Sequence, residues 1–421
     1  MITFIFPEKH VGGVQNLILN LTRQLYHEYS IRVKIVDYVD GYVVKKLEED
    51  KVDFVFAEYD LVFKFIAFIK NEDTIILTGF NKRLLYKLKR QNINPKFIFW
   101  NVFPSAIGRI NMLYGFFKLP YYYLNSTSLL LKMVIKKKAL YFMSRNGIDF
   151  VSKTFDISIE SQDGIFLPVP IQDIQPGSFS QDHSTALVKE SAQICISYIG
   201  RSDIWKVMPL LSIIRDIIYC EKTDNVTLYI ITNESHIFIN YINKYFMNDN
   251  LPKIIYCTDL AGEVLSNFLV DNIDLNISMG TAALESSVLG IPTILVDASH
   301  NIYPNSYKYR WLYECKYYDL GNLLFKGDFN HTGHSFIEIY DATSDPRRNK
   351  IIAEKCYEYT ICNHSIKGVT KIFIEAVKNT SAKIDDAIPY LLYFDIIGLA
   401  SEIQSVFLSL LKIPIDKIKK F

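Results

Sequence analysis

The sequence predicts an α/β protein with two consecutive domains, each built on a mostly parallel sheet. Short β-rich runs alternate with segments of helical periodicity in both halves of the chain, which is typical of parallel βαβ units. The length of 421 residues also exceeds what one ordinary core accommodates. The alternation stops at Pro168 and Pro170, where a stretch rich in Gln, Asp, Ser, Pro and Gly begins. We therefore expect an interdomain linker at residues 171–190.

The first domain is expected to span residues 1–170. Its β-rich runs predict strands at residues 2–6, 32–39, 52–56, 74–77 and 96–100. A helix should follow the first strand, because Leu17, Ile18, Leu21 and Leu25 recur at helical spacing.

The second domain is expected to span residues 191–378. Strands are predicted at residues 194–199, 226–232, 253–257, 273–278 and 293–296. Helices are predicted at residues 259–270 and 281–289, the second of which should end at Gly290. Residues 379–421 are expected to form an apolar, helical C-terminal tail. Two such domains predict a cleft, with ligands bound outside the carboxyl ends of the strands.

Composition and cysteine usage favour a cytoplasmic globular protein. Hydrophobic residues make up 49% of the chain and charged residues 22%, which suits a packed fold. The six cysteines all lie beyond residue 194 and form no CxxC pair, so neither a disulfide framework nor a zinc site is predicted. The N-terminus resembles a first strand rather than a signal peptide, and we expect no membrane-spanning helix.

Charge is distributed unevenly, which predicts different partners for the two halves. The first 170 residues hold 23 Lys and Arg against 16 Asp and Glu, and residues 74–148 contain 13 basic residues and no acidic one. Within that stretch Lys132, Lys136, Lys137 and Lys138 adjoin the apolar run 129–131 and follow the tyrosines 121–123. This pattern predicts a peripheral, interfacial segment on an anionic membrane. The alternative is a solvated basic face over an ordinary core helix.

The first candidate binding motif follows the strand at residues 194–199. Gly200 and Arg201 come directly after it, and Lys206 lies five residues beyond Arg201. A guanidinium fork and a mobile ammonium at a strand end could bind a diphosphate and neutralise charge on a leaving group. The alternative is a basic pair on a solvated loop.

The second candidate motif joins the strand at residues 273–278 to a helix. The amides of Gly280, Thr281 and Ala282 are expected to be free at the helix N-terminus, where the dipole favours phosphate. Glu285 lies one turn further and could accept hydrogen bonds from ribose hydroxyls, as acidic residues do in dinucleotide-binding folds. The alternative is a Glu that only complements the helix dipole.

The third candidate is the pair Gly12 and Gly13 between the first strand and the first helix. Glycines let a ligand approach the backbone closely, so Gly12 and Gly13 are candidate donor-binding residues, and the neighbouring His10 could touch the acceptor or a sugar. A simple turn is the alternative.

Taken together, these motifs resemble the retaining GT-B glycosyltransferases of family 4, a bacterial surface-polysaccharide type. Three family features occur in order: the Gly12–Gly13 turn, Gly200-Arg201 with Lys206, and a late helix reading Leu284-Glu285-Ser-Ser-Val-Leu-Gly290-Ile-Pro292-Thr-Ile. The resemblance implies two Rossmann-like domains facing a cleft. It also implies that Arg201 and Lys206 bind the donor diphosphate, that Glu285 binds the ribose, and that the Gly280 loop approaches the phosphates. No metal cofactor is implied.

The chain departs from the family pattern at the donor sugar. The family usually has a Glu eight positions before the Glu285 equivalent, and here that position is Ile277. The histidine that many relatives carry at the end of an N-terminal strand has no counterpart in Phe99-Trp-Asn-Val-Phe-Pro104. Both differences bear on sugar recognition and on the retaining outcome.

We therefore expect transfer of a sugar from a nucleoside diphosphate to a hydroxyl of a saccharide or of a lipid-pyrophosphate-linked saccharide. The N-terminal domain should bind the acceptor, and the C-terminal domain should bind the donor. A nucleotide-sugar epimerase of the same fold is the nearest alternative, since it needs no acceptor. A nucleic-acid-binding protein that uses residues 74–148 is the other, but it would leave Arg201, Lys206 and Glu285 without a role.

Overall fold

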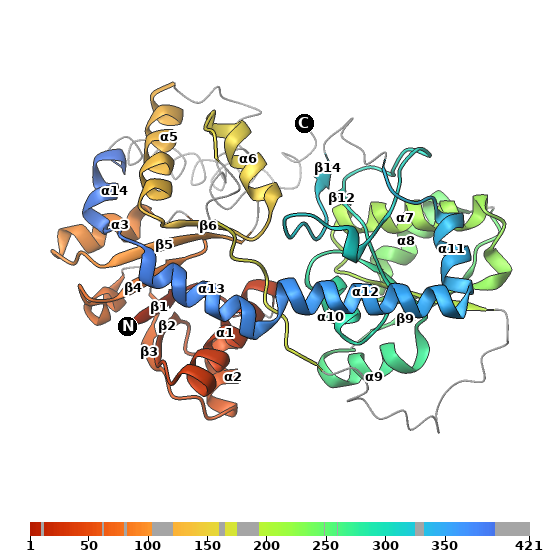
Figure 1. The fold of residues 1–421 in the computed structure, drawn as a ribbon, viewed down its shortest axis with the longest axis horizontal. Coiled ribbons are helices and arrows are strands. Elements are labelled where there is room, and N and C mark those ends of the chain that lie inside the picture. Colours follow the sequence, from red (N-terminus) through yellow and green to blue (C-terminus); the bar gives the residue numbers. More distant parts are fainter. Residues whose placement is uncertain are drawn as a thin grey trace, which may run out of the picture. The chain divides into compact units, whose positions relative to one another are not determined.

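A computed structural model describes residues 1–9, 12–60, 63–79, 82–102, 121–159, 165–174, 193–247, 249–258, 260–324 and 332–391. The chain forms two compact units (Figure 1). The N-terminal unit comprises Met1–Leu167 together with Ile372–Phe421, and the C-terminal unit comprises Pro168–Lys371.

The N-terminal unit contains a parallel sheet in the order β3-β2-β1-β4-β5-β6. Its described strands are β1 (Ile2–Ile5), β2 (Val33–Asp37), β3 (Val55–Glu58), β4 (Thr74–Leu77), β5 (Lys96–Asn101) and β6 (Leu140–Phe142). Most of these short runs are buried along their whole length, as expected for parallel strands covered on both faces. The strand order reverses between β1 and β4, and this reversal is the topological switch point of the sheet.

The helices of this unit are α1 (Gly13–Tyr29), α2 (Tyr42–Glu49), α3 (Lys82–Arg90), α5 (Tyr121–Lys136) and α6 (Arg145–Phe155), with a 3₁₀ turn, η1 (Lys64–Phe68). In α1 the predicted apolar stripe is buried: Leu17, Ile18, Leu21 and Leu25 are at most 3% exposed. The helical spacing of these residues therefore identified the buried face correctly.

The C-terminal unit repeats the topology, with the order β13-β11-β10-β7-β8-β9. Its strands are β7 (Ile194–Ile199), β8 (Val226–Ile231), β9 (Lys253–Cys257), β10 (Leu275–Ser278), β11 (Thr293–Leu295) and the antiparallel edge strand β13 (Arg310–Trp311). A small separate pair joins β12 (Ala298–Ser299) to β14 (Leu323–Leu324). The switch point lies between β7 and β10.

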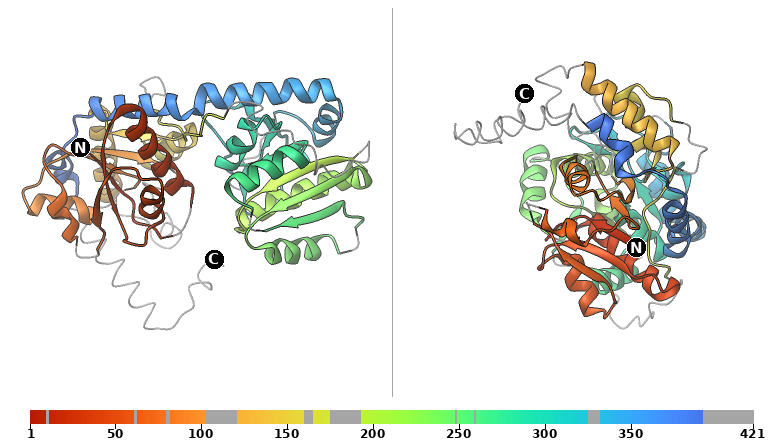
Figure 2. Two further views of the ribbon diagram at one scale, coloured as in Figure 1. Left: turned by 90° about the horizontal axis from the view of Figure 1, so that it is seen from below. Right: turned by 90° about the vertical axis from the view of Figure 1, so that its left-hand side faces the viewer.

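The helices of the C-terminal unit are α7 (Ile204–Tyr219), α8 (Ser235–Tyr245), α9 (Gly262–Asn272), α10 (Thr281–Val288), α11 (Phe336–Ser344) and α12 (Pro346–His364), with the short turns η4 (Thr223–Asn225) and η5 (Leu312–Glu314). The crossover helices lie on both faces of each sheet (Figure 2). Both units are therefore doubly wound, Rossmann-like α/β structures, as predicted.

The C-terminal part of the chain divides differently from the expected domain at 191–378 and tail at 379–421. Helix α13 (Ile366–Asn379) carries the boundary between the units, and α14 (Ile384–Leu391) packs against α3 and α5. Phe373 is fully buried and stacks on Phe4 with ring centroids 5.7 Å apart. Ala382, Ile384 and Ala387 belong to a core cluster of the N-terminal unit that also contains Ile5, Leu77 and Phe99. This apolar burial returns residues 372–391 to the N-terminal unit.

The start of the predicted linker also belongs to a packed unit. Ile171 donates its amide to the carbonyl of His364 at 2.7 Å, and its own carbonyl accepts the amide of Ile366 at 2.8 Å. Residues 175–192 of the predicted linker lie outside the described residues.

Helix α5 differs in part from the interfacial segment that its sequence predicts. Leu130 and Leu131 are fully buried, so that of the three leucines only Leu129 is exposed. The ammonium of Lys137 pairs with Asp386 at 2.8 Å, whereas Lys132, Lys136 and Lys138 are exposed. Among the described side chains from Thr127 to Lys138, the exposed ones are thus three lysines and one leucine. None of the described helices is both long enough and apolar enough to cross a bilayer.

We predict that Phe373→Ala destabilises the N-terminal unit by about 3–5 kcal/mol, because a fully buried ring is replaced by a cavity. Phe68→Ala is the matched control, since Phe68 lies in the same unit but is 54% exposed. Urea unfolding followed by fluorescence of the neighbouring Trp100, in a variant whose other tryptophans are replaced, measures both. Equal unfolding midpoints for the two variants would contradict the packing of α13 on this sheet.

Candidate functional site

The switch point of the C-terminal unit brings two of the predicted motifs together. Strands β7 and β10 are parallel neighbours, and their last residues, Ile199 and Ser278, are directly paired. The loops that follow therefore emerge side by side at the carboxyl edge of the sheet, one carrying Gly200 and Arg201 and the other carrying Gly280. This edge is where open α/β sheets bind ligands.

Gly200 allows the first turn of α7 to close onto the strand end. A Cβ atom at this position would lie 3.3 Å from both Cδ of Lys206 and Cε1 of Tyr198, which is tighter than ordinary contact. Arg201 points into solvent, with 72% of its side chain exposed, and its only described ion pair is with Asp203 at 3.3 Å. The guanidinium is therefore available to an anionic ligand.

Lys206 lies in the first turn of α7 and is half-buried. Its Nζ is 5.2 Å from the centre of the Trp205 ring, and no ion pair with it occurs among the residues that the structure describes. Burial, with a smaller contribution from the neighbouring Arg201, lowers the pKa of Lys206 to about 8. A cation that is desolvated without a counterion gains most from a bound anion such as a diphosphate.

Gly280 begins α10 in a conformation that favours glycine, with φ +67° and ψ −141°. We expected three free amides here, and one of them is not free, because the amide of Gly280 donates to the carbonyl of Leu320 at 2.7 Å. Thr281 and Ala282 are the first two residues of the helix, and amides in that position have no partner within the helix. The N-terminus of α10 therefore offers an anion two amides, those of Thr281 and Ala282, rather than the three that were predicted.

Glu285 lies in the second turn of α10 and is half-buried. Burial raises the pKa of its carboxyl to about 6. Within the described part of the chain it forms no ion pair and no side-chain hydrogen bond, so its oxygens remain available to ribose hydroxyls. Ile277, where family 4 has its earlier Glu, is a buried residue of β10 and offers a sugar no polar contact.

Gly12 and Gly13 lie at the corresponding edge of the N-terminal unit. Strand β1 pairs with β4 at its switch point through Ile5 and Leu77, and α1 starts at Gly13 with Gly12 as its N-cap. The backbone of Gly12 is extended, and a Cβ on Gly13 would meet nothing within 4 Å. The predicted sugar contact His10 lies outside the described residues.

Two polar residues at strand ends of the N-terminal unit were not singled out from the sequence. Asn101 ends β5 and is 2% exposed, and among the residues that the structure describes neither its amide nitrogen nor its oxygen has a hydrogen-bond partner. Asp37 ends β2, where burial raises its carboxyl pKa to about 6 although one oxygen accepts the amides of Glu8 and Tyr38. A polar residue that closes an apolar strand run is the signal that could have identified both.

No protein-family model and no curated protein matches the sequence. Solved structures do match. A glycosyltransferase from Rickettsia africae covers 90% of this chain and 98% of its own, with a TM-score of 0.59 and 14% identity. HepE from Anabaena, in complex with UDP and glucose, covers 90% and 99%, with a TM-score of 0.54 and 10% identity. The lipopolysaccharide outer core galactosyltransferase WaaB covers 89% and 98%, with a TM-score of 0.53 and 12% identity.

The fold is GT-B. The likeness extends over both units, because about nine-tenths of the chain is matched in each case. In this GT-B protein Arg201, Lys206, Gly280 and Glu285 all belong to the C-terminal unit, whereas Gly12 and Gly13 belong to the N-terminal unit.

We predict that diphosphate binding weakens as pH rises above about 8. Lys206 is charged below this pH, and a bound diphosphate raises its pKa, so binding at higher pH must take up a proton. UDP affinity, measured by calorimetry between pH 7 and 9.5, should fall by up to about tenfold per pH unit above 8.

The variant Lys206→Ala should bind UDP more weakly at every pH. Its affinity should not decrease further as the pH rises above 8. Lys244→Ala, which removes an exposed cation from the same unit, should behave like the wild type. An equally steep fall in Lys206→Ala would assign the titration to another group.

Proposed function

We propose that this protein is a glycosyltransferase that moves a sugar from a nucleoside-diphosphate donor to a hydroxyl of a saccharide or lipid-linked saccharide. One observation carries the proposal: the β7–β10 switch point collects two cations, a helix N-terminus and an unpaired carboxylate. These groups match the diphosphate and the ribose of such a donor. The GT-B fold, and the binding of UDP and glucose by HepE, support this choice of ligand.

In the proposed reaction the bond between the anomeric carbon and the β-phosphate oxygen breaks, and a bond from that carbon to the acceptor oxygen forms. The acceptor hydroxyl passes its proton to the departing diphosphate. Arg201, Lys206 and the amides of Thr281 and Ala282 stabilise the charge that develops on the leaving diphosphate. Glu285 holds the ribose and so fixes the position of the donor. No metal ion is invoked in this scheme.

The finer assignments rest on the resemblance to family 4. They are a retaining outcome, a hexosyl donor, an acceptor bound by the N-terminal unit and a role in surface-polysaccharide assembly at the inner face of the membrane. WaaB, by its name, modifies lipopolysaccharide, which supports such an acceptor. In the N-terminal unit, Asn101 is a candidate acceptor contact because it ends β5 at the carboxyl edge of the sheet, whereas the Gly12–Gly13 turn at the same edge is assigned to the donor.

The function is tested with a panel of UDP-, GDP-, ADP- and CDP-sugars, measured first by thermal shift and then by transfer to polyprenyl-pyrophosphate-linked saccharides. Arg201→Ala should lower transfer about a hundredfold. Glu285→Gln should weaken nucleoside-diphosphate binding about tenfold, since it loses charge-assisted hydrogen bonds. Glu263→Gln changes an exposed first-turn carboxylate of α9 and is the matched control.

Three outcomes separate the alternatives. Binding of no nucleotide sugar overturns the proposal. Isomerisation of the donor sugar without an acceptor identifies the epimerase instead. Unchanged affinity in Glu285→Gln leaves that carboxylate with no role beyond the helix dipole.

We further propose that the exposed lysines of α5 and of the turn that follows it, Lys132, Lys136 and Lys138, bind an anionic membrane surface. Each lysine near such a surface contributes about 1 kcal/mol. Replacing Lys132, Lys136 and Lys138 with Glu should release the protein from phosphatidylglycerol vesicles in co-sedimentation and leave nucleotide binding unchanged. Lys137 is left in place because its charge is paired with Asp386.

The matched control replaces Lys45, Lys51 and Lys64, which are exposed lysines elsewhere in the same unit. A wild-type protein that does not bind these vesicles at low salt would favour a solvated basic face and a soluble acceptor.

A further inference from the structure

The turn at Gly280 is held from outside its own helix by the segment Leu320–Gly321–Asn322. Leu320 accepts the Gly280 amide at 2.7 Å. Gly321 has φ +111°, and a Cβ on it would lie 2.6 Å from the carbonyl oxygen of Val296 and 3.0 Å from Cβ of Met279. The segment therefore packs its backbone against the carbonyl of Val296 and against Cβ of Met279, the residue that precedes Gly280. No side chain fits at position 321 without moving one of the two.

The carboxylate of Asp297 holds the backbone of this segment in place. Its side chain is fully buried, and Oδ1 accepts the amide of Asn322 at 2.8 Å and Nη2 of Arg310 at 2.7 Å. The hydroxyl of Tyr307 donates to Oδ2 at 2.8 Å. The backbone of Asn322 is held a second time, because its carbonyl accepts the amide of Ala298 at 2.7 Å. A carboxylate with this many donors has one stable orientation.

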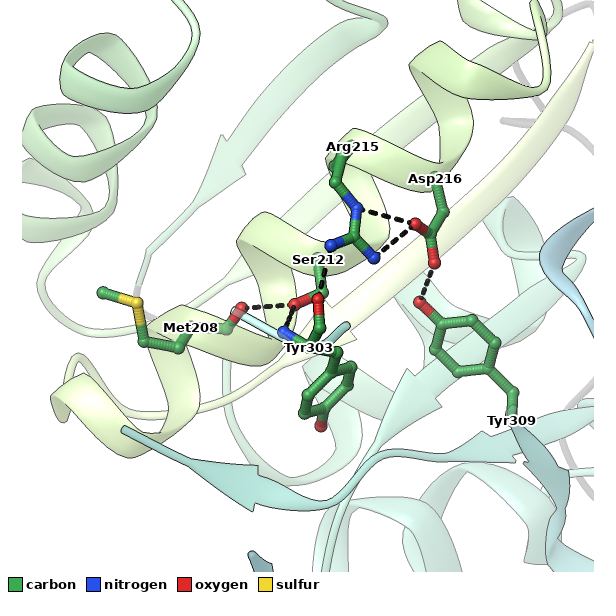
Figure 3. Close-up of polar contacts among 6 residues, drawn as sticks. All are labelled: Met208, Ser212, Arg215, Asp216, Tyr303 and Tyr309. Carbon is green, nitrogen blue, oxygen red and sulfur yellow. Dashed lines mark hydrogen bonds and ion pairs between the residues drawn. The ribbon is translucent and has the colours of Figure 1, made fainter. Parts of the chain in front are cut away.

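Tyr303 and Tyr309 are anchored in turn to α7 (Figure 3). The first turn of this helix carries Lys206. The amide of Tyr303 donates to Oγ of Ser212 at 2.8 Å, and that hydroxyl donates to the carbonyl of Met208 at 3.0 Å. Arg215 donates to the carbonyl of Tyr303 and forms a bidentate ion pair with Asp216. The hydroxyl of Tyr309 donates to the other oxygen of Asp216 at 2.7 Å.

A continuous polar network therefore joins the two sides of the candidate diphosphate site. It starts on α7, passes through residues 303–310 to Asp297, and reaches the Gly280 turn through Asn322 and Leu320. We propose that Gly321 and Asp297 are positioning residues that set the Gly280 turn relative to α7, so that Lys206 and the amides of Thr281 and Ala282 reach one diphosphate. This inference rests on the proposed function and assigns neither residue a contact with the ligand.

Gly321→Ala tests the proposal directly. The added methyl group meets backbone rather than a flexible side chain, so the 320–322 segment must shift and take the Leu320 carbonyl with it. A misplacement of about 1 Å can lower activity a hundredfold, so we expect at least a tenfold loss of nucleoside-diphosphate affinity. Affinity for the nucleoside without phosphates should change less than about twofold, because only the phosphates use the amides of the turn.

Gly262→Ala is the matched control, because Gly262 also has a positive φ, +57°, but a Cβ there would meet nothing within 4 Å. Gly262→Ala introduces backbone strain without a steric clash, so it should change neither the diphosphate affinity nor the nucleoside affinity. Asp297 itself is a poor first target, since its removal leaves the charge of Arg310 uncompensated. Tyr307→Phe is the second variant: it keeps the ring stacked on Tyr303 and removes only the hydroxyl bond to Asp297. It should lower diphosphate affinity about threefold.

The first probe is whichever of UDP, GDP, ADP and CDP the wild type binds best, and its affinity is measured by calorimetry. The second probe is the corresponding nucleoside, and its affinity is measured by NMR titration. A selective loss of diphosphate affinity in folded Gly321→Ala or Tyr307→Phe supports the proposal. An unchanged affinity, or an equal loss for diphosphate and nucleoside, overturns it while the glycosyltransferase assignment stands. A wild type that binds none of the four diphosphates overturns the proposed function itself.

Discussion

The pairing of β7 with β10 is the constraint on which the candidate site depends. Ile199 and Ser278 are 79 residues apart in sequence, yet the parallel register places them side by side at the ends of their strands. Every donor-binding candidate of the C-terminal unit follows one of these two residues within eight positions. The shared edge converts two weak local motifs into one arrangement of cations, helix amides and a carboxylate. A register slip would turn the buried side chains of both strands to the opposite face, so core packing holds the site in place.

Most strands and the two loops of the candidate site could be predicted from the sequence because the signals for them are local. Apolar runs and helical spacing identify the strands and α1, and a strand followed by Gly200 or Gly280 marks a carboxyl edge. Two such series in succession predict two α/β domains, and the resemblance to family 4 implies that they form a GT-B fold. The half-buried state of Lys206 and Glu285 was not predicted from the sequence, and neither was the pKa shift that this burial causes.

Other features could not be predicted because they depend on contacts between distant residues. No local pattern indicates that the Gly280 amide meets the carbonyl of Leu320, forty positions away. The same is true of Leu130 and Leu131, whose apolar character fits a membrane interface and a protein core equally well. The stretch without acidic residues is similarly misleading, since Asp385 and Asp386 of α14 supply carboxylates to Lys89 and Lys137. The basic surface is therefore smaller than the sequence indicates.

The return of residues 372–391 to the N-terminal unit has a consequence for biosynthesis. On the ribosome the chain emerges from its N-terminus, and domains ordinarily fold in that order. Here the sheet formed by the first 167 residues lacks Phe373, Ile384 and Ala387 until more than 200 further residues have been made. The C-terminal unit is one continuous segment and has fully emerged by then. Vectorial synthesis therefore allows the second unit to complete its core first, while the nascent first unit keeps an apolar surface exposed that chaperones could bind.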